Sequence, residues 1–249
     1  MAAVRSCLHL LWMLVTVIPV ALYLMLSAVL GASGHRLYRL ARFWLWLSIV
    51  GAKTILGIRY RVEGEANLPT GDLPAVLLVK HQSTYETFLM PAIMPRDLAY
   101  VFKKELLYVP FFGWAIGRLD MIHIDRRLRK QAFHKVAQQG RALLQRGVWI
   151  IMFPEGTRIE RGKTGEYKSG GARLAIDVGV PVVPIAVNSG LCWPRKAFIK
   201  RPGLVTVSIG KPIQSVGRDP DELMAEVQQW IESEMRRLDP QAYLEQDTL

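Results

Sequence analysis

The chain has 249 residues, of which 51% are hydrophobic and 21% are charged. This composition excludes a disordered chain and a membrane protein built only of spanning helices, and the length allows one large domain or two small ones. The formal net charge of +11 is concentrated at the amino terminus, because residues 1–62 contain seven Lys and Arg and no Asp or Glu. Basic charge interleaved with Trp and Leu favours an anionic membrane lipid surface, and not nucleic acid, as the partner of this region.

The first predicted element is a helix over residues 7–30, which carry no formal charge. A helix of this length reaches about 36 Å, enough to cross the hydrocarbon core of a bilayer. A cleaved signal peptide is the competing interpretation. Its usual apolar core is shorter, and here Arg5 alone forms the positive flank.

Residues 36–58 are predicted to form a helix at the membrane interface, since their longest uncharged stretch, residues 43–52, is too short to span a bilayer. On a helical wheel Arg39, Arg42 and Lys53 fall within about 60° of one another, beside a broad apolar face. The two helices form either a hairpin in one leaflet or a span followed by a surface helix. The absence of acids speaks against a buried hairpin. Bases after the first helix favour the cytoplasmic face of a bacterial inner membrane for the rest of the chain.

After residue 59, short apolar runs alternate with helical segments. Strands are predicted at residues 60–63, 74–79, 98–102, 121–124, 148–153, 182–187 and 204–209. Helices are predicted at residues 84–94, 104–107, 127–146, 171–178 and 221–238. This alternation predicts an α/β fold with a mainly parallel sheet of about seven strands flanked by helices. Residues 59–249 would form this domain, and residues 1–58 a two-helix membrane motif before it.

A histidine, His81, leaves the carboxyl end of the predicted strand at residues 74–79, and Glu86 follows five residues later. Sheets of this class place their chemistry at that edge. The two side chains can meet only if His81 lies in the turn before the helix and Glu86 in its first turn. Ser83 supports this placement, because Ser-x-x-Glu is a capping box. Taken alone, the pattern favours a capping glutamate and a polar residue at a strand end over a catalytic pair.

The second informative stretch is Phe-Pro-Glu-Gly-Thr-Arg at residues 153–158, which follows another predicted strand. Gly156 can adopt a positive φ, and Arg158 offers a bidentate fork to a phosphate. An ordinary turn with a surface arginine is the alternative. The nearby Gly162-Lys163-Thr164 has the wrong spacing for a nucleotide-binding loop. No Cys/His grouping has the spacing of a zinc site, so no metal is predicted.

Together, four blocks resemble the 1-acylglycerol-3-phosphate acyltransferases in order and spacing. They are the His-x-x-x-x-acid at residues 81–86, the Lys-Lys-Glu-Leu to Asp-Arg block at residues 103–126, the turn at residues 153–158, and the Val-Pro-Val-Val-Pro strand at residues 180–188. The resemblance covers residues 59–213. The family commonly has Asp where this chain has Glu86, which is one methylene longer.

The resemblance implies an enzyme that moves a fatty acyl group from acyl-CoA or acyl carrier protein to a lysophosphatidate, with no cofactor beyond the acyl thioester. It implies His81 as the general base and Glu86 as the carboxylate that orients it. The implied substrate-binding residues are Lys103, Lys104, Arg126, Glu155, Gly156, Thr157 and Arg158. Of these, Arg158 with Lys103 or Lys104 would hold the phosphate, and Arg126 is a weaker candidate. Residues 109–114 either line an acyl cleft or pack in the core.

Two rival functions stay open. The chain could acylate another lyso-lipid, such as a lyso-ornithine lipid or lysophosphatidylglycerol, because the head group depends on pocket shape. It could also be a basic membrane lipid-binding protein without catalysis, although such a protein needs no His–carboxylate pair beside an arginine turn. Deleting residues 1–58 is expected to release the protein from membranes.

Overall fold

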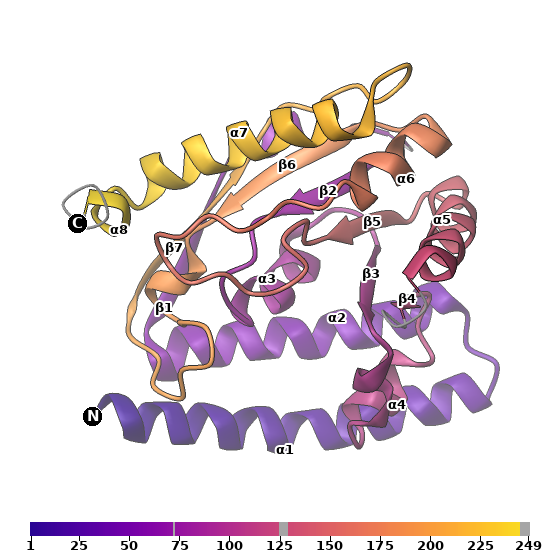
Figure 1. The fold of residues 1–249 in the computed structure, drawn as a ribbon. Coiled ribbons are helices and arrows are strands. Elements are labelled where there is room, and N and C mark those ends of the chain that lie inside the picture. The colour runs from indigo at the N-terminus through magenta and orange to yellow at the C-terminus, as the bar shows by residue number, and fades with distance from the viewer. Residues whose placement is uncertain (72, 125–128, 245–249) are drawn as a thin grey trace.

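The computed structural model describes residues 1–71, 73–124 and 129–244 of the chain (Figure 1). The strands are β1 (Ile58–Glu63), β2 (Val76–Val79), β3 (Leu98–Lys103), β4 (Ile122–Ile124), β5 (Trp149–Met152), β6 (Val182–Val187) and β7 (Gly203–Ile209). The longer helices are α1 (Ala2–Val29), α2 (Gly34–Gly51), α3 (Tyr85–Ile93), α5 (Arg129–Gln145), α6 (Gly170–Val178) and α7 (Pro220–Leu238). Shorter helical segments are η1 (Ala52–Leu56), η2 (Glu65–Asn67), η3 (Lys104–Tyr108), α4 (Phe112–Ile116), η5 (Ser189–Leu191) and α8 (Gln241–Leu244).

The strands lie in the order β1-β7-β6-β2-β5-β3-β4 within one sheet. Neighbouring strands are parallel, except for β6 and β7, which are antiparallel. The predicted mainly parallel sheet of seven strands is therefore confirmed, and each predicted strand end lies within two residues of the observed one. The short helix α4 was not predicted, because five residues carry too little periodicity to show a helix.

Side chains alternate between the two faces of the sheet, so the strands contribute to two separate cores. On one face, Leu77 and Ile151 pack with residues of α2 and α3. On the other face, Val76 and Ile150 pack with residues of α5, α6 and α7. Figure 1 shows these two helical layers on opposite sides of the sheet, with α1 outermost beside α2.

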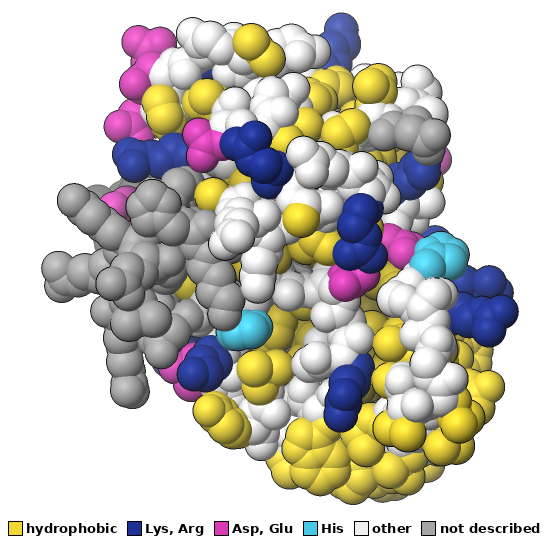
Figure 2. Space-filling model, turned by 90° about the vertical axis from the view of Figure 1, so that its right-hand side faces the viewer, with side chains coloured by type: hydrophobic (Ala, Val, Ile, Leu, Met, Phe, Trp, Pro, Cys, Tyr) yellow, Lys and Arg dark blue, Asp and Glu magenta, His cyan; other side chains and the backbone are white. Residues whose placement is uncertain are grey.

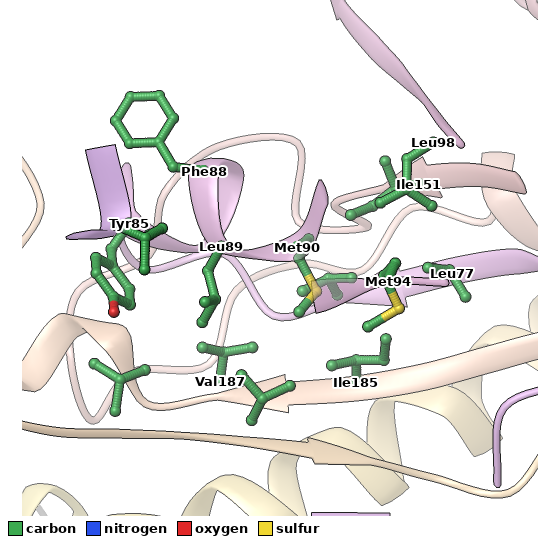
Figure 3. Packing of buried hydrophobic residues seen from close by; sticks show 14 of the residues in the cluster. Leu77, Tyr85, Phe88, Leu89, Met90, Met94, Leu98, Ile151, Ile185 and Val187 are labelled. Carbon is green, nitrogen blue, oxygen red and sulfur yellow. The ribbon is translucent and has the colours of Figure 1, made fainter. Parts of the chain in front are cut away.

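Helix α3 lies between the sheet and α2. Leu89 and Met90 face the strand residues, among them Val187, in Figure 3. Phe88 points away from the sheet and meets Trp44 of α2, with ring centroids 5.7 Å apart. This double packing holds the start of α3, and the turn before it, in a fixed position.

Helices α1 and α2 pack against each other along their length. At Gly51 a side-chain Cβ would lie 2.5 Å from Cδ1 of Trp12, so only glycine allows this approach. The indole N–H of Trp12 donates to the Leu47 carbonyl at 3.0 Å. In the part of the chain that the structure describes, α1 is the one helix long and apolar enough to cross a membrane, and most of its side chains are exposed.

Helix α2 and segment η1 belong to the main core. Tyr38, Trp44, Ile49 and Leu56 are buried in the same cluster as the strand residues. The boundary predicted at residue 58 therefore does not separate two hydrophobic cores, and the division into two domains stays a prediction. Because deleting residues 1–58 would expose this cluster to water, membrane binding needs a test that leaves α2 in place.

Candidate active site

Four adjacent strands end at one edge of the sheet. The strands β6, β2, β5 and β3 are parallel neighbours, so their carboxyl ends meet there. His81 follows β2, Arg158 follows β5, and Lys103 is the last residue of β3. Ser189 follows β6. The sheet thus brings residues from four separate parts of the chain to one edge.

His81 lies in the turn before α3 and Glu86 in its first turn, as the sequence predicted. The Nδ1–H of His81 donates to Oε1 of Glu86 at 2.9 Å. The same oxygen accepts the backbone N–H of Gln82 at 2.8 Å and of Ser83 at 2.6 Å. Helix α3 begins at Tyr85, one residue later than predicted, and the Ser83 hydroxyl accepts the N–H of Tyr85 at 3.0 Å. Glu86 therefore caps the helix and holds the imidazole at the same time.

The second carboxylate oxygen of Glu86 also has a partner. Oε2 accepts the hydroxyl of Ser189 at 2.5 Å, and both residues are fully buried. Gln82 reinforces this contact between two loops, since its side-chain Oε1 accepts the N–H of Gly190 at 3.2 Å. Four donors on its two oxygens satisfy the buried Glu86 carboxylate and fix its direction.

The turn after β5 holds His81 itself. Oε2 of Glu155 accepts the N–H of His81 at 2.9 Å, and the N–H of Ile159 donates to the His81 carbonyl at 2.7 Å. The ring of Phe153 stacks on the imidazole, with centroids 3.9 Å apart and planes 14° apart. Backbone and ring are thus held on several sides, and 12% of the His81 side chain stays exposed. Nε2 of His81 has no hydrogen-bond partner among the described residues.

Lys80 is buried between two carboxylates next to this site. Its Nζ lies 2.6 Å from Oε1 of Glu155 and 2.6 Å from Oε1 of Glu232 on α7. The hydroxyl of Tyr167 donates to the same Glu232 oxygen at 2.8 Å. Burial raises the pKa of Glu155, and the Lys80 ammonium opposes this rise. Glu155, predicted to bind substrate, thus faces Lys80 and the His81 backbone, where it shapes the turn.

Three of the basic residues predicted to hold a phosphate, Arg158, Lys103 and Lys104, lie at the same edge. The Nε–H of Arg158 donates to the Ser83 carbonyl at 3.1 Å, which places the guanidinium beside the His81 turn. Lys103 and Lys104 are exposed at the end of β3. Arg126 lies outside the described residues.

The turn itself has the predicted glycine conformation. Gly156 has a φ of 64°, and its N–H donates to the Phe153 carbonyl at 2.9 Å, so this donor is used within the turn. Thr157 is exposed. Its N–H and that of Arg158 have no protein partner in the described structure, and these two donors remain for a ligand.

An apolar cavity of about 130 Å³ reaches this edge between the sheet and the amino-terminal helices. Its walls come from α1, α2, α3, β3 and α4, including Leu24, Trp44 and Phe88. Tyr100 lines it and lies 6.2 Å from the Phe153 ring that stacks on the imidazole. Of the predicted cleft residues 109–114, Phe112 contributes to the wall.

Titratable side chains elsewhere do not converge as metal ligands would. Within the described residues, no three His, Cys, Asp or Glu side chains form such a group. His123 lies on β4, and Asp125, which alternates with it in the sequence, lies outside the described residues.

Comparison with known proteins identifies the family of the chain. The family profile described as Acyltransferase matches residues 59–188. A 1-acyl-sn-glycerol-3-phosphate acyltransferase from Pseudomonas aeruginosa is 43% identical over 202 residues, which cover 80% of this chain and 76% of the relative. The chain belongs to the 1-acyl-sn-glycerol-3-phosphate acyltransferase family. The family resemblance predicted from the four sequence blocks is therefore confirmed, and so is the prediction that the chain is an enzyme.

More distant relatives of this acyltransferase show the same relationship. The alpha form from Homo sapiens is 30% identical over 184 residues, which cover 73% of this chain and 64% of that relative. The crystal structure of the 1-acyl-sn-glycerophosphate (LPA) acyltransferase from Thermotoga maritima superposes with a TM-score of 0.78 at 24% identity. It covers 96% of this chain and 98% of its own, which confirms the fold over nearly the whole length.

In this acyltransferase, two residues of the candidate site, Ser189 and Lys80, could not be assigned a role from the sequence. Ser189 follows the strand at residues 182–187, and pairing of that strand with β2 would have indicated it. Lys80 is a charged residue at the end of an apolar run, and the sequence does not show that it is buried between two carboxylates. Each partner lies far along the chain, so sequence spacing alone could not reveal these contacts.

Proposed function

We propose that this acyltransferase moves a fatty acyl group from acyl-CoA or acyl carrier protein to the free sn-2 hydroxyl of 1-acyl-glycerol-3-phosphate, giving phosphatidic acid. The observation that carries the proposal is the His81–Glu86 pair, with Nδ1 2.9 Å from Oε1, at the sheet edge. A histidine whose Nδ1–H is held by a carboxylate presents Nε2 as a base. The names of the relatives supply the substrate class.

In this mechanism the oxygen of the substrate hydroxyl attacks the thioester carbonyl, and Nε2 of His81 takes the proton of that hydroxyl. A C–O bond forms and the C–S bond breaks, and the thiolate leaves with the proton that the imidazolium returns. Glu86 stabilises the imidazolium and fixes the ring. No acyl-enzyme is needed, because the substrate hydroxyl is the nucleophile. The thioester is already activated, so the proposal includes no further cofactor.

The phosphate of the acceptor would bind between the basic residues at the edge. Arg158 is tied to the Ser83 carbonyl through Nε, which leaves its terminal nitrogens to form the fork. Lys103 and Lys104 add positive charge from the end of β3. The N–H groups of Thr157 and Arg158 are available to the developing oxyanion.

The apolar cavity would receive an acyl chain of one of the substrates. Thr87 and Phe88, which follow Glu86 on α3, line the cavity. In this proposal the acyl chain extends from the reacting centre into the cavity. Each CH₂ buried there gains about 0.8 kcal/mol relative to water.

Helix α1 would lie in one leaflet of the membrane instead of crossing it. The Ser6 hydroxyl near its start accepts the N–H of Lys200, and Leu24 near its end lines the cavity. Because both ends contact the rest of the enzyme, α1 cannot stand across a bilayer without drawing the sheet inside. Figure 2 shows hydrophobic side chains gathered at the lower end of the molecule, where α1 lies, with the charged groups above them. We place the site at the cytoplasmic face, where acyl-CoA and acyl carrier protein are available.

Acyl transfer by purified enzyme, measured across a panel of lyso-lipids with both acyl donors, tests the reaction. The panel includes lysophosphatidate, lysophosphatidylglycerol and lyso-ornithine lipid. His81→Ala should lower the rate by at least about 10², the contribution of a general base, while remaining folded. His35→Ala is the matched control, since His35 is an exposed histidine paired with Asp97. Full activity of His81→Ala would overturn the mechanism. If the enzyme acylated another lyso-lipid of the panel and not lysophosphatidate, the proposed acceptor would be wrong.

Membrane binding needs its own test. Leu11, Leu14 and Ile18 are exposed on α1. Replacing all three with Gln should move the enzyme from the membrane pellet to the supernatant, because it removes apolar area from the lipid contact without touching the core. Complete retention in the pellet would contradict the proposed role of α1.

A further inference from the structure

The connection between β6 and β7 carries basic and aromatic side chains that the proposed reaction does not use. Its sequence over residues 195–201 is Arg-Lys-Ala-Phe-Ile-Lys-Arg. In Figure 1 the orange segment beyond β6 extends down toward the amino-terminal half of α1. We call residues 195–201 the basic loop.

The basic loop is fixed to α1 by contacts at its stem. The N–H of Lys200 donates to the Ser6 hydroxyl at 3.0 Å, and the ammonium of Lys200 lies 4.8 Å from the centroid of the Trp193 ring. Trp193 in turn meets the ring of His9 on α1, with centroids 5.4 Å apart. The N–H of Arg201 donates to the Cys192 carbonyl at 2.8 Å and closes the loop. The loop is therefore held beside the helix.

The tip of the basic loop exposes large apolar side chains. Phe198 is 49% exposed and Ile199 is 47% exposed, and the ammonium of Lys200 lies 5.1 Å from the centroid of the Phe198 ring. Three exposed bases, Arg195, Lys196 and Arg201, flank them. Lys196 adopts a φ of 59°, an unfavourable conformation for a residue with a side chain, and such strain persists where the surrounding structure imposes it.

The loop is continuous with the apolar surface of α1. Leu10, one turn after Ser6, is exposed on this helix. Arg5 approaches Pro202, since both lie within 4 Å of the Cβ position of Gly57. An anionic bilayer binds surfaces on which apolar and aromatic groups lie next to bases. The lipid tails contact the apolar and aromatic groups, and the lipid phosphates contact the bases.

We propose that the basic loop is a second membrane-contact element, which inserts Phe198 and Ile199 into an anionic leaflet and places Arg195, Lys196 and Arg201 at lipid phosphates. The proposal rests on the proposed membrane binding of α1. Because the connection begins at Ser189, which bonds Glu86, lipid contact there holds the site at a set height above the phosphates. An acidic carrier protein would complement the bases, but it would not explain apolar side chains continuous with α1.

Fluorescence of single labelled cysteines in the full chain tests this proposal. Cys7→Ser removes the exposed thiol, whereas Cys192 is buried and burial raises its pKa to about 11, so it does not react at neutral pH. An environment-sensitive dye is then placed at Phe198→Cys. Val216→Cys is the control, because Val216 is exposed near Gly179 at the end of α6, on the side of the sheet away from α1. Leu11→Cys reports α1 itself.

The enzyme is reconstituted in phosphatidylcholine discs with and without phosphatidylglycerol, and lipid-borne spin labels serve as quenchers. The dye at position 198 should emit at shorter wavelength and be quenched, and the dye at position 216 should not. Quenching at 11 without quenching at 198 overturns the loop proposal and leaves α1 binding intact. Quenching at neither position overturns the membrane proposal as well. If acyl carrier protein, and not lipid, shifts the emission of the dye at position 198, the loop proposal is also overturned.

The charges are tested with Arg195→Gln, Arg201→Gln and Lys196→Gly, of which the last keeps the positive φ without strain. The preference for discs that contain phosphatidylglycerol should fall about fivefold per base removed. Acyl transfer in detergent should not change, which shows that the variants fold. An unchanged lipid preference in the triple variant would overturn the proposed role of the bases.

Discussion

Nζ of Lys80 lies 2.6 Å from Oε1 of Glu155, and both side chains are fully buried. The other oxygen of that carboxylate accepts the N–H of His81. Lys80 thus holds Glu155, which in turn holds the backbone of His81. Glu232 connects Lys80 to α7. A buried ammonium needs such partners, because desolvation without them costs several kcal/mol.

Lys80→Met should lower the free energy of unfolding by about 3–5 kcal/mol, since it leaves the buried carboxylate of Glu155 and the partly buried carboxylate of Glu232 without their cation. Thermal unfolding in detergent measures this change. Lys163→Met is the matched control: its ammonium pairs with Glu160 at the exposed surface, and its carbonyl, which Lys80 also contacts, is unchanged. Equal melting temperatures for the two variants would contradict the structural role of Lys80.

Glu86→Gln should separate the capping role of Glu86 from its charge. The amide oxygen can still accept from His81, Gln82 and Ser83, so the melting temperature should stay near that of the wild type. The lost negative charge no longer stabilises the imidazolium, so kcat should fall by about 10² or more. Glu86→Asp keeps the charge and should retain more activity. A Gln variant as active as the wild type would leave Glu86 with a capping role alone.

The local part of this site could be predicted from the sequence, and the distant part could not. His81 and Glu86 are five residues apart, so strand-end and capping signals placed them correctly. Ser189 lies 103 residues from Glu86, and Glu232 lies 152 residues from Lys80. Such contacts depend on strand order, which periodicity does not determine. The amino-terminal region shows the same limit: its charge predicts a membrane motif, but it does not predict that Trp44 and Leu56 are buried in the core of the sheet.

Ser189→Ala should test whether the contact with Glu86 positions the base. Loss of a hydrogen bond to a charged group costs about 1.5–3 kcal/mol, which corresponds to a decrease in kcat of about tenfold or more with KM nearly unchanged. Ser208→Ala is the matched control. The Ser208 hydroxyl also donates to a carboxylate, that of Glu234, at 2.6 Å, but this pair lies away from the site. If both serine variants reduced kcat alike, general destabilisation would account for the loss.

The cavity should set the length of the acyl chain that the enzyme accepts. Ala115 on α4 lines the cavity, and Ala115→Phe would fill part of its about 130 Å³ with a ring. Long acyl chains should then lose kcat/KM relative to short ones, while the rate with the shortest chains stays close to that of the wild type.

Competition between acyl donors of different length, and then between lyso-lipids of different length, shows which substrate enters the cavity, since only that series should change. Ala66→Phe provides the control, because Ala66 is exposed in η2. A chain-length profile of Ala115→Phe identical to that of the control would mean that neither acyl chain occupies the cavity. A uniform loss of rate at all lengths would point instead to displacement of α4, because overpacking shifts the surrounding elements.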